Sequence, residues 1–205
     1  MLILVSGGSC AGKSTFAAQL NRTLISEGLS GGTVSTDLFY HDLPADTPLE
    51  RHNFDSEDSV DSHMMLNVCS RYASGTAPFP VFDFRTHKRS GIMEIPPLSV
   101  LILEGIFSLS FPQITALPSL KVFINTGDSE RYKRRLAFYS ETLGHSREFI
   151  DYKFFKQAEP YYRKAIEPWQ YKADLAVSGE KDFGPAVSRI SELWFRSFRE
   201  TASRK

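Results

Sequence analysis

The chain has 205 residues, the size of one α/β domain, and its 24 Lys and Arg residues balance 24 Asp and Glu residues. This balance excludes a global field that would attract nucleic acid or an anionic membrane, so neither is expected as a partner. Two cysteines exclude a disulfide framework, and no apolar run is long enough for a signal peptide or a membrane span. We therefore expect a soluble, cytoplasmic protein that forms a single domain over residues 1–205.

A glycine-rich loop lies between the apolar run of residues 2–5 and a segment with helical spacing of apolar residues. Residues 7–14 fit the pattern G-x-x-x-x-G-K-[ST], the P-loop, whose main-chain N–H groups and following helix N-terminus bind phosphates. An ordinary glycine-rich turn is the alternative, but it explains the flanking strand and helix less well. Lys13 would reach the β- and γ-phosphates of a nucleotide, and Ser14 would ligate Mg²⁺. The expected phosphate-binding residues are Gly7, Gly8, Ser9, Cys10, Ala11, Gly12, Lys13, Ser14 and Thr15.

Helical and strand-like segments alternate along the chain, which is typical of a parallel α/β sheet. Apolar residues recur at helical spacing over residues 16–25 and 60–72, and further strand-like runs cover residues 33–36, 99–105, 121–125 and 174–178. The second of these runs is apolar until Glu104, as in a buried strand with a Walker-B carboxylate at its tip. Asp37 falls at the end of another strand, where open parallel sheets bind ligands. We expect a doubly wound, five-stranded parallel sheet.

Two insertions are expected in this sheet. Residues 78–84 and 91–95 form short alternating runs, which predict a β-hairpin flap over about 78–96. Asp128 opens a helical stretch that would form a lid over about 127–168, in which Pro160 and Pro168 are expected to bend or end helices. A final helix would carry on its packing face Val187, Ile190, Leu193, Trp194 and Phe198.

Further motifs lie at defined places along the chain. They are S-T-D-L-F-Y at residues 35–40, N-F-D at 53–55, P-V-F-D-F-R-T-H-K-R at 80–89, L-E-G-I at 103–106, the arginines Arg131, Arg134 and Arg135, and Y-K-A-D at 171–174. Together with the P-loop, their order and spacing resemble the uridine–cytidine kinases of the P-loop kinase class. The resemblance implies the P-loop kinase fold, ATP as phosphate donor with Mg²⁺ as cofactor, a ribonucleoside acceptor and a homo-oligomer, usually a tetramer.

The resemblance also implies which residues transfer the phosphoryl group. Asp37 would accept the proton of the 5′-hydroxyl, with Lys13 and Arg135 completing the catalytic group, and Ser14 and Glu104 would hold Mg²⁺. Without such a role, Asp37 would be a turn or cap aspartate. On the donor side, the family pattern places Arg131 and Arg134 near phosphate and Asp182 near adenine. One of the three arginines Arg131, Arg134 and Arg135 is expected to be a solvated helix residue.

On the acceptor side, Asp55 corresponds to the family carboxylate that binds the ribose hydroxyls, and Arg135 to an arginine that contacts the nucleoside. His87 corresponds to the histidine that reads the pyrimidine edge; an exposed flap histidine is the alternative. The remaining expected substrate-binding residues are Asp37 and the ring-bearing residues Tyr40, Phe54, Phe82 and Phe84.

The chain also departs from the family pattern. Phe82 stands where the family has a flap tyrosine, and Lys153 stands at a glutamine position. Positions that hold lid arginines in the family hold Phe138, Leu143 and His145 here. These changes leave phosphate neutralisation to Lys13, Mg²⁺ and the cluster of Arg131, Arg134 and Arg135.

Three functions are compatible with these residues. The first is ATP-dependent phosphorylation of the 5′-hydroxyl of uridine or cytidine, giving UMP or CMP for nucleotide salvage. The second is phosphorylation of another small alcohol, such as nicotinamide riboside or pantothenate. The third is a catalytically weak, nucleotide-binding regulatory protein, which the joint presence of Lys13, Asp37 and Glu104 disfavours because a binding module needs no proton acceptor.

Overall fold

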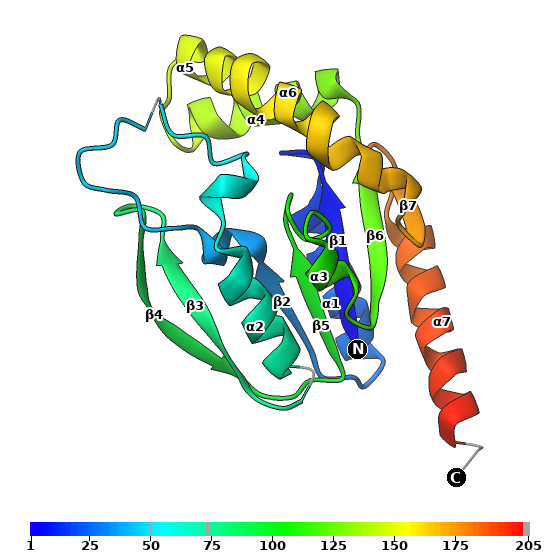
Figure 1. The fold of residues 1–205 in the computed structure, drawn as a ribbon. Coiled ribbons are helices and arrows are strands. Elements are labelled where there is room, and N and C mark those ends of the chain that lie inside the picture. The colour runs from blue at the N-terminus through cyan, green and yellow to red at the C-terminus, as the bar shows by residue number, and fades with distance from the viewer. Residues whose placement is uncertain (50, 73, 203–205) are drawn as a thin grey trace.

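The computed structural model describes residues 1–205 except 50, 73 and 203–205, and side chains are described up to residue 194. Its centre is a five-stranded sheet in the order β2 (Gly31–Ser35), β5 (Val100–Glu104), β1 (Leu2–Gly7), β6 (Ser119–Asn125) and β7 (Leu175–Ser178). Every pairing in this sheet is parallel, and β1 lies in the middle (Figure 1). The predicted doubly wound α/β sheet is confirmed.

Alternation along the strands separates two apolar cores, one on each face of the sheet. In β1, Leu2 and Leu4 point to one core and Ile3 and Val5 to the other. Helices α2 (Ser62–Tyr72) and α3 (Pro112–Thr115) contribute to the first core, and α1 (Lys13–Ser26) and α7 (Gly184–Ala202) contribute to the second. Both faces of the sheet are therefore covered, which explains why its central strands are continuously apolar.

The packing face of α7 is narrower than the sequence pattern predicts. Val187 and Ile190 are buried in the core that α7 shares with α1, and Trp194 packs against it. Leu193, however, is 49% exposed. Phe198 lies outside the residues whose side chains the structure describes.

The predicted flap forms as a two-stranded antiparallel hairpin, β3 (Ala77–Asp83) and β4 (Lys88–Ile95), with an irregularity in the pairing between Val81 and Phe82. Phe79 anchors the hairpin, because its ring packs edge-on against Phe39 at 6.1 Å and Tyr72 at 6.3 Å. Phe39 belongs to the short 3₁₀ helix η1 (Thr36–Phe39) that follows β2. A second 3₁₀ turn, η2 (Glu57–Ser59), precedes α2.

The lid region contains α4 (Asp128–Glu141) and a second helical run that starts with α5 (Arg147–Tyr152). This run continues as π-helix over Lys153–Ala158, α6 (Glu159–Tyr161), π-helix over Tyr162–Ile166 and a 3₁₀ turn over Glu167–Tyr171. Pro160 lies inside the run and does not end it. Since proline lacks the N–H group of the α-helical ladder, the wider turns on both sides accommodate it. Pro168 lies in the tighter 3₁₀ turn that ends the run.

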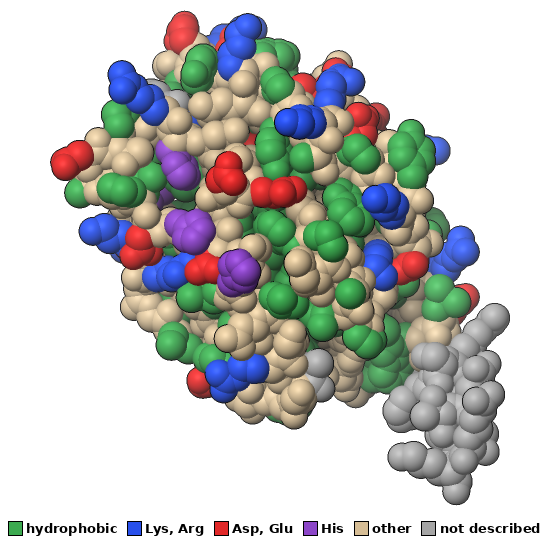
Figure 2. Space-filling view, in the orientation of Figure 1, with side chains coloured by type: hydrophobic (Ala, Val, Ile, Leu, Met, Phe, Trp, Pro, Cys, Tyr) green, Lys and Arg blue, Asp and Glu red, His purple; other side chains and the backbone are tan. Residues whose placement is uncertain are grey.

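The surface carries charges of both signs. Figure 2 shows acidic and basic side chains interspersed over the face in view, without a continuous basic patch on that face. No helix in the described part of the chain is long and apolar enough to cross a membrane.

Candidate active site

The P-loop connects the end of β1 to the start of α1. Gly12 precedes α1 with φ 101°, a left-handed conformation that glycine adopts at little cost. Gly7 has φ 147°, and a Cβ atom there would lie 2.5 Å from the main-chain oxygen of Ile124 in β6. Lys13, the first residue of α1, is buried and donates from Nζ to the main-chain oxygen of Gly8 at 2.8 Å. The lysine ammonium group therefore lies against the loop that would hold the phosphates.

The loop is supported from the opposite side by residues that follow β6 and β7. The hydroxyl of Thr126 donates to the main-chain oxygen of Ala11 at 2.8 Å. Arg134, on α4, donates to the main-chain oxygens of Gly179 at 2.9 Å and Ala11 at 3.4 Å, and it pairs with Glu130 at 2.9 Å. These bonds hold the main chain of the P-loop in place and bring a guanidinium group to its rim.

Ser14 and Glu104 bring two oxygen donors together beside the P-loop. The Ser14 hydroxyl, in the first turn of α1, donates to Oε1 of Glu104 at the end of β5, at 3.1 Å. A hydroxyl and a carboxylate fit Mg²⁺, which prefers oxygen ligands and usually takes few of them from the protein, the rest being water and phosphate. The described residues contain no cluster of three or more His, Cys, Asp or Glu able to hold a metal ion.

Asp37 lies at the carboxyl end of β2, as predicted, within η1. Its main-chain N–H donates to the Ser35 hydroxyl at 3.1 Å, which caps this short helix. Burial, followed by the nearby negative charge of Glu104, raises the pKa of Asp37 to about 6, and the positive charge of Lys13 opposes the shift. The aspartate therefore lies within electrostatic reach of both Lys13 and Glu104.

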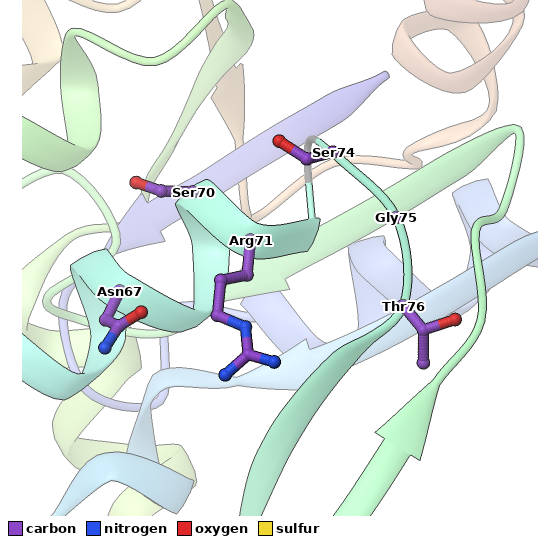
Figure 3. A pocket seen from close by; sticks show the side chains of 6 residues that line it. All are labelled: Asn67, Ser70, Arg71, Ser74, Gly75 and Thr76. Carbon is purple, nitrogen blue, oxygen red and sulfur yellow. The ribbon is translucent and has the colours of Figure 1, made fainter.

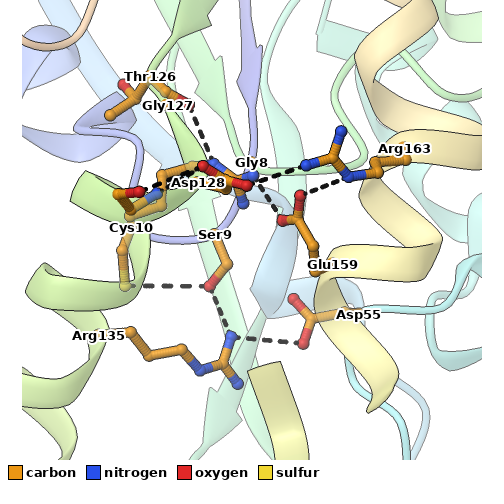
Figure 4. Close-up of polar contacts among 12 residues, drawn as sticks. Gly8, Ser9, Cys10, Asp55, Thr126, Gly127, Asp128, Arg135, Glu159 and Arg163 are labelled. Carbon is orange, nitrogen blue, oxygen red and sulfur yellow. Dashed lines mark hydrogen bonds and ion pairs between the residues drawn. The ribbon is translucent and has the colours of Figure 1, made fainter. Parts of the chain in front are cut away.

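Arg135 links the P-loop to Asp55. Its Nη1 donates to the Ser9 hydroxyl at 3.0 Å and lies 3.6 Å from Oδ2 of Asp55 (Figure 4). The guanidinium group also lies over the ring of Tyr139, with its central carbon 4.7 Å from the ring centroid. Tyr139 has no family motif of its own; its spacing of four residues from Arg135 on α4 is the signal that could have indicated it.

Aromatic rings gather beside Asp55. The Phe54 ring stacks on the His87 ring at 5.4 Å between centroids, and it meets Tyr40 edge-on at 5.2 Å and His52 at 4.3 Å. Phe82 packs against Tyr40 at 5.8 Å and is only 4% exposed, so its ring is part of the core under the flap.

Phe84 lies at the outer end of this group. Its ring contacts Phe82 at 5.3 Å, but it is 54% exposed. Of the predicted ring contacts, Phe54 and His87 thus form the stacked pair. Phe82 is linked to this pair through the ring of Tyr40, and Phe84 is exposed.

Arg131 occupies a buried position under the P-loop. It is 1% exposed, its Nη2 pairs with Glu159 at 2.5 Å, and its Nε donates to the main-chain oxygen of Thr126 at 3.1 Å. Arg163 binds the same glutamate at 2.9 Å and also pairs with Asp128, so α4 and the second lid run are tied together (Figure 4). The expectation that one of Arg131, Arg134 and Arg135 is a solvated helix residue is wrong, because each of them makes specific polar contacts.

A groove of about 510 Å³ runs along the outer side of the P-loop. Its lining residues are Cys10, Gly12, Lys13, Ser14, Thr15, Arg134, Phe138, Gly179 and Phe183. Asp182 is exposed and does not line the groove, whereas its neighbours Gly179 and Phe183 do. Sequence reasoning missed these two residues, although their position directly after β7, at the carboxyl edge of the sheet, could have indicated them.

A second depression, of about 480 Å³, lies between the end of α2 and the start of β3 (Figure 3). Its lining residues are Asn67, Ser70, Arg71, Ser74, Gly75 and Thr76. None of the residues of the P-loop or of the motifs that carry the family resemblance lines it.

The chain matches known proteins over most of its length. The sequence profile of the "Phosphoribulokinase / Uridine kinase family" matches residues 2–182. A uridine kinase from Chlamydia pneumoniae is 30% identical over 184 residues, which cover 87% of this chain and 82% of that protein. A uridine kinase from Ligilactobacillus salivarius is 30% identical over 182 residues, covering 86% and 84%.

Solved structures share the fold. A protein from Silicibacter, provisionally described as a fructose transport system kinase, superposes with a TM-score of 0.72 at 22% identity, over 86% of this chain and 88% of that chain. Phosphoribulokinase from Rhodobacter spheroides superposes with a TM-score of 0.68 at 15% identity, over 86% of this chain and 69% of that chain. The family model over residues 2–182 and the two uridine kinases at 30% identity show that this chain belongs to the phosphoribulokinase/uridine kinase family and is an ATP-dependent kinase.

Proposed function

We propose that the protein transfers the γ-phosphoryl group of ATP to the 5′-hydroxyl of a pyrimidine ribonucleoside. The observation that carries this proposal is Arg135, whose Nη1 contacts both Ser9 in the P-loop and Asp55 on the acceptor side. One guanidinium group thereby joins a phosphate-binding loop to a carboxylate suited to vicinal hydroxyls. The uridine kinases among the relatives support the same acceptor class.

The residues around the P-loop supply what phosphoryl transfer needs. The 5′-hydroxyl oxygen bonds to the γ-phosphorus while the bond from that phosphorus to the β,γ-bridging oxygen breaks, and ADP leaves. Asp37 takes the hydroxyl proton, and its raised pKa of about 6 brings its proton affinity closer to neutrality than that of an ordinary aspartate. Lys13 and Arg135 face the negative charge of the transferring group. Ser14 and Glu104 would hold Mg²⁺, which neutralises phosphate charge when bound.

The acceptor is held by groups of two kinds. Asp55 would accept hydrogen bonds from the ribose 2′- and 3′-hydroxyls, and the stacked rings of Phe54 and His87 would contact the base. Phe82 has no hydroxyl and is buried, so it offers the base no hydrogen bond. Base recognition would therefore depend on His87 and on ring contact, which discriminates between ligands only modestly.

A coupled assay of ADP release tests the proposal. The acceptors are uridine, cytidine, a purine nucleoside, nicotinamide riboside and pantothenate, with ATP and Mg²⁺, and the Lys13→Ala variant serves as the blank. We expect turnover with uridine and cytidine that exceeds ATP hydrolysis without acceptor and is abolished in Lys13→Ala. Turnover confined to nicotinamide riboside or pantothenate would show that the acceptor is not a pyrimidine nucleoside. Tight ATP binding with no turnover on any acceptor would indicate a regulatory protein.

A further inference from the structure

Lys153 is a buried lysine on the second helical run of the lid. Its Nζ donates to the main-chain oxygens of Leu49 at 2.7 Å and His52 at 2.5 Å, and to the side-chain oxygen of Gln157 at 2.9 Å. The first two acceptors lie in the segment before the N-F-D motif, 104 and 101 residues earlier in the chain. A single ammonium group therefore joins the lid to this segment.

Burial makes these bonds costly to lose. An ammonium group taken out of water is stable only where hydrogen-bond acceptors replace its hydration, and the two main-chain oxygens are such acceptors. In return, the main chain of the segment is held to the lid at two points, Leu49 and His52. Replacing the lysine with an apolar residue would release the segment and leave both carbonyl groups without this donor.

The segment held by Lys153 leads directly into the acceptor site. The ring of His52 contacts the ring of Phe54 at 4.3 Å, and Phe54 stacks on His87 of the flap at 5.4 Å. Asp55, the next residue, lies 3.6 Å from Arg135. The position of the segment thus sets the position of the carboxylate and of the stacked rings that would bind the acceptor.

The same lid run is fastened to the P-loop side six residues later. Glu159 pairs with Arg131, and a Cβ atom added to Gly8 would lie 2.9 Å from Nη1 of that arginine. Arg131 therefore lies directly against the P-loop. The lid run has one anchor on the phosphate side, at Glu159, and one on the acceptor side, at Lys153.

We propose that Lys153 is a positioning residue that holds the acceptor-binding segment, residues 49 and 51–55, against the lid and so sets affinity for the acceptor but not for ATP. The identity of the acceptor rests on the proposed function, whereas the hold on the segment does not. Lys153 itself reaches main-chain carbonyl groups, so it acts through the segment and not by direct contact with the reacting atoms.

Three variants test the proposal. Lys153→Met removes the ammonium group at similar length, and Lys153→Gln restores an N–H donor. Lys156→Met is the matched control, because Lys156 lies on the same helical run and is exposed. For each variant we would measure KM for uridine and for ATP, kcat, and hydrogen–deuterium exchange of residues 49–55 in the absence of substrate.

In Lys153→Met we expect the KM for uridine to rise about tenfold or more, with the KM for ATP and kcat within about twofold of the parent. Hydrogen–deuterium exchange should accelerate in residues 49–55 but not in the P-loop. Lys153→Gln should partly restore both the KM for uridine and the slow exchange, and Lys156→Met should match the parent in both. Unchanged exchange in residues 49–55, or a parallel loss of affinity for uridine and ATP, would overturn the proposal. If no nucleoside is phosphorylated by the parent, the proposed function fails, yet the exchange experiment still decides whether Lys153 holds the segment.

Discussion

The hydroxyl of Ser14 lies 3.1 Å from Oε1 of Glu104, a hydrogen bond between residues 90 positions apart in the chain. Ser14 comes from the first turn of the helix that follows β1, and Glu104 ends β5, the strand that pairs with β1. Parallel pairing brings the carboxyl ends of the two strands to the same edge, which is why a helix-start hydroxyl and a strand-end carboxylate converge beside the P-loop.

Removal of either oxygen should weaken the hold on Mg²⁺. We expect Glu104→Gln and Ser14→Ala to raise the Mg²⁺ concentration for half-maximal activity by about tenfold or more, since each loses a ligand to a hard cation. Activity measured over a Mg²⁺ titration at fixed ATP gives the result. Ser26→Ala, in the exposed last turn of the same helix, is the control and should titrate like the parent. An unchanged midpoint in both variants would remove these residues from the metal site.

Asp37 and Asp55 should separate into a catalytic and a binding role. Asp37→Asn preserves size but removes the proton acceptor, so kcat should fall about a hundredfold or more while nucleoside affinity changes little. Asp55→Asn removes the negative charge beside Arg135 and should chiefly weaken nucleoside binding. Steady-state kinetics and calorimetry check both. Equal losses of affinity with kcat preserved in both variants would show that the roles are assigned incorrectly.

The raised pKa of Asp37 should also appear in the stability of the metal-free protein. Its folded-state pKa of about 6 lies above the ordinary 3.8, so the folded state binds more protons than the unfolded chain between these values. The free energy of unfolding should therefore fall as pH rises from about 4 to 6, and the penalty persists above that range. Asp37→Asn removes the penalty and should gain about 2–3 kcal/mol at pH 8 and little at pH 4. Urea unfolding at the two pH values measures the gain in the free energy of unfolding. Equal gains at both pH values would show that the pKa of Asp37 is not raised in the folded state.

The two cysteines should differ in reactivity. Burial raises the pKa of Cys69 to about 12, and its side chain is enclosed in the core, so it should resist a disulfide reagent at pH 8. Cys10 is partly exposed in the P-loop and lines the groove. We expect one rapidly labelled thiol, which is lost in Cys10→Ala, retained in Cys69→Ala and protected by ATP with Mg²⁺. A thiol of Cys10 that reacts equally fast with and without nucleotide would place ATP elsewhere.

Base preference should depend on the stacked histidine. His87→Ala removes the ring that lies on Phe54, and we expect the ratio of kcat/KM between uridine and a purine nucleoside to approach one. His63→Ala, an exposed histidine on α2, is the control. Phe82→Tyr should raise kcat/KM for pyrimidine nucleosides relative to other acceptors, provided that the new hydroxyl finds a hydrogen-bond partner at this buried position. Sharp pyrimidine selectivity that neither variant changes would mean that the base is read elsewhere.

The local sequence already determines a large part of this molecule. The P-loop can be predicted because its glycines allow the main chain to bend closely around phosphates within a few consecutive residues, and Gly12 adopts a positive φ. The central strands can be predicted because strands covered on both faces are continuously apolar, as in residues 100–103. Asp37 and Glu104 follow from the same pattern, since each comes at the end of a strand.

Only the tertiary structure decides what the charged side chains of the lid do. Nothing in the neighbourhood of Arg131 indicates that it pairs with Glu159, and nothing near Lys153 indicates the carbonyl groups of Leu49 and His52. Likewise, the family resemblance places Asp182 near adenine, yet it is the neighbouring Phe183 that lines the groove. Backbone conformation and strand burial depend on a few consecutive residues and can be predicted from them. A long, flexible side chain can bind a partner that is distant in the sequence, and the local pattern does not specify which partner it binds.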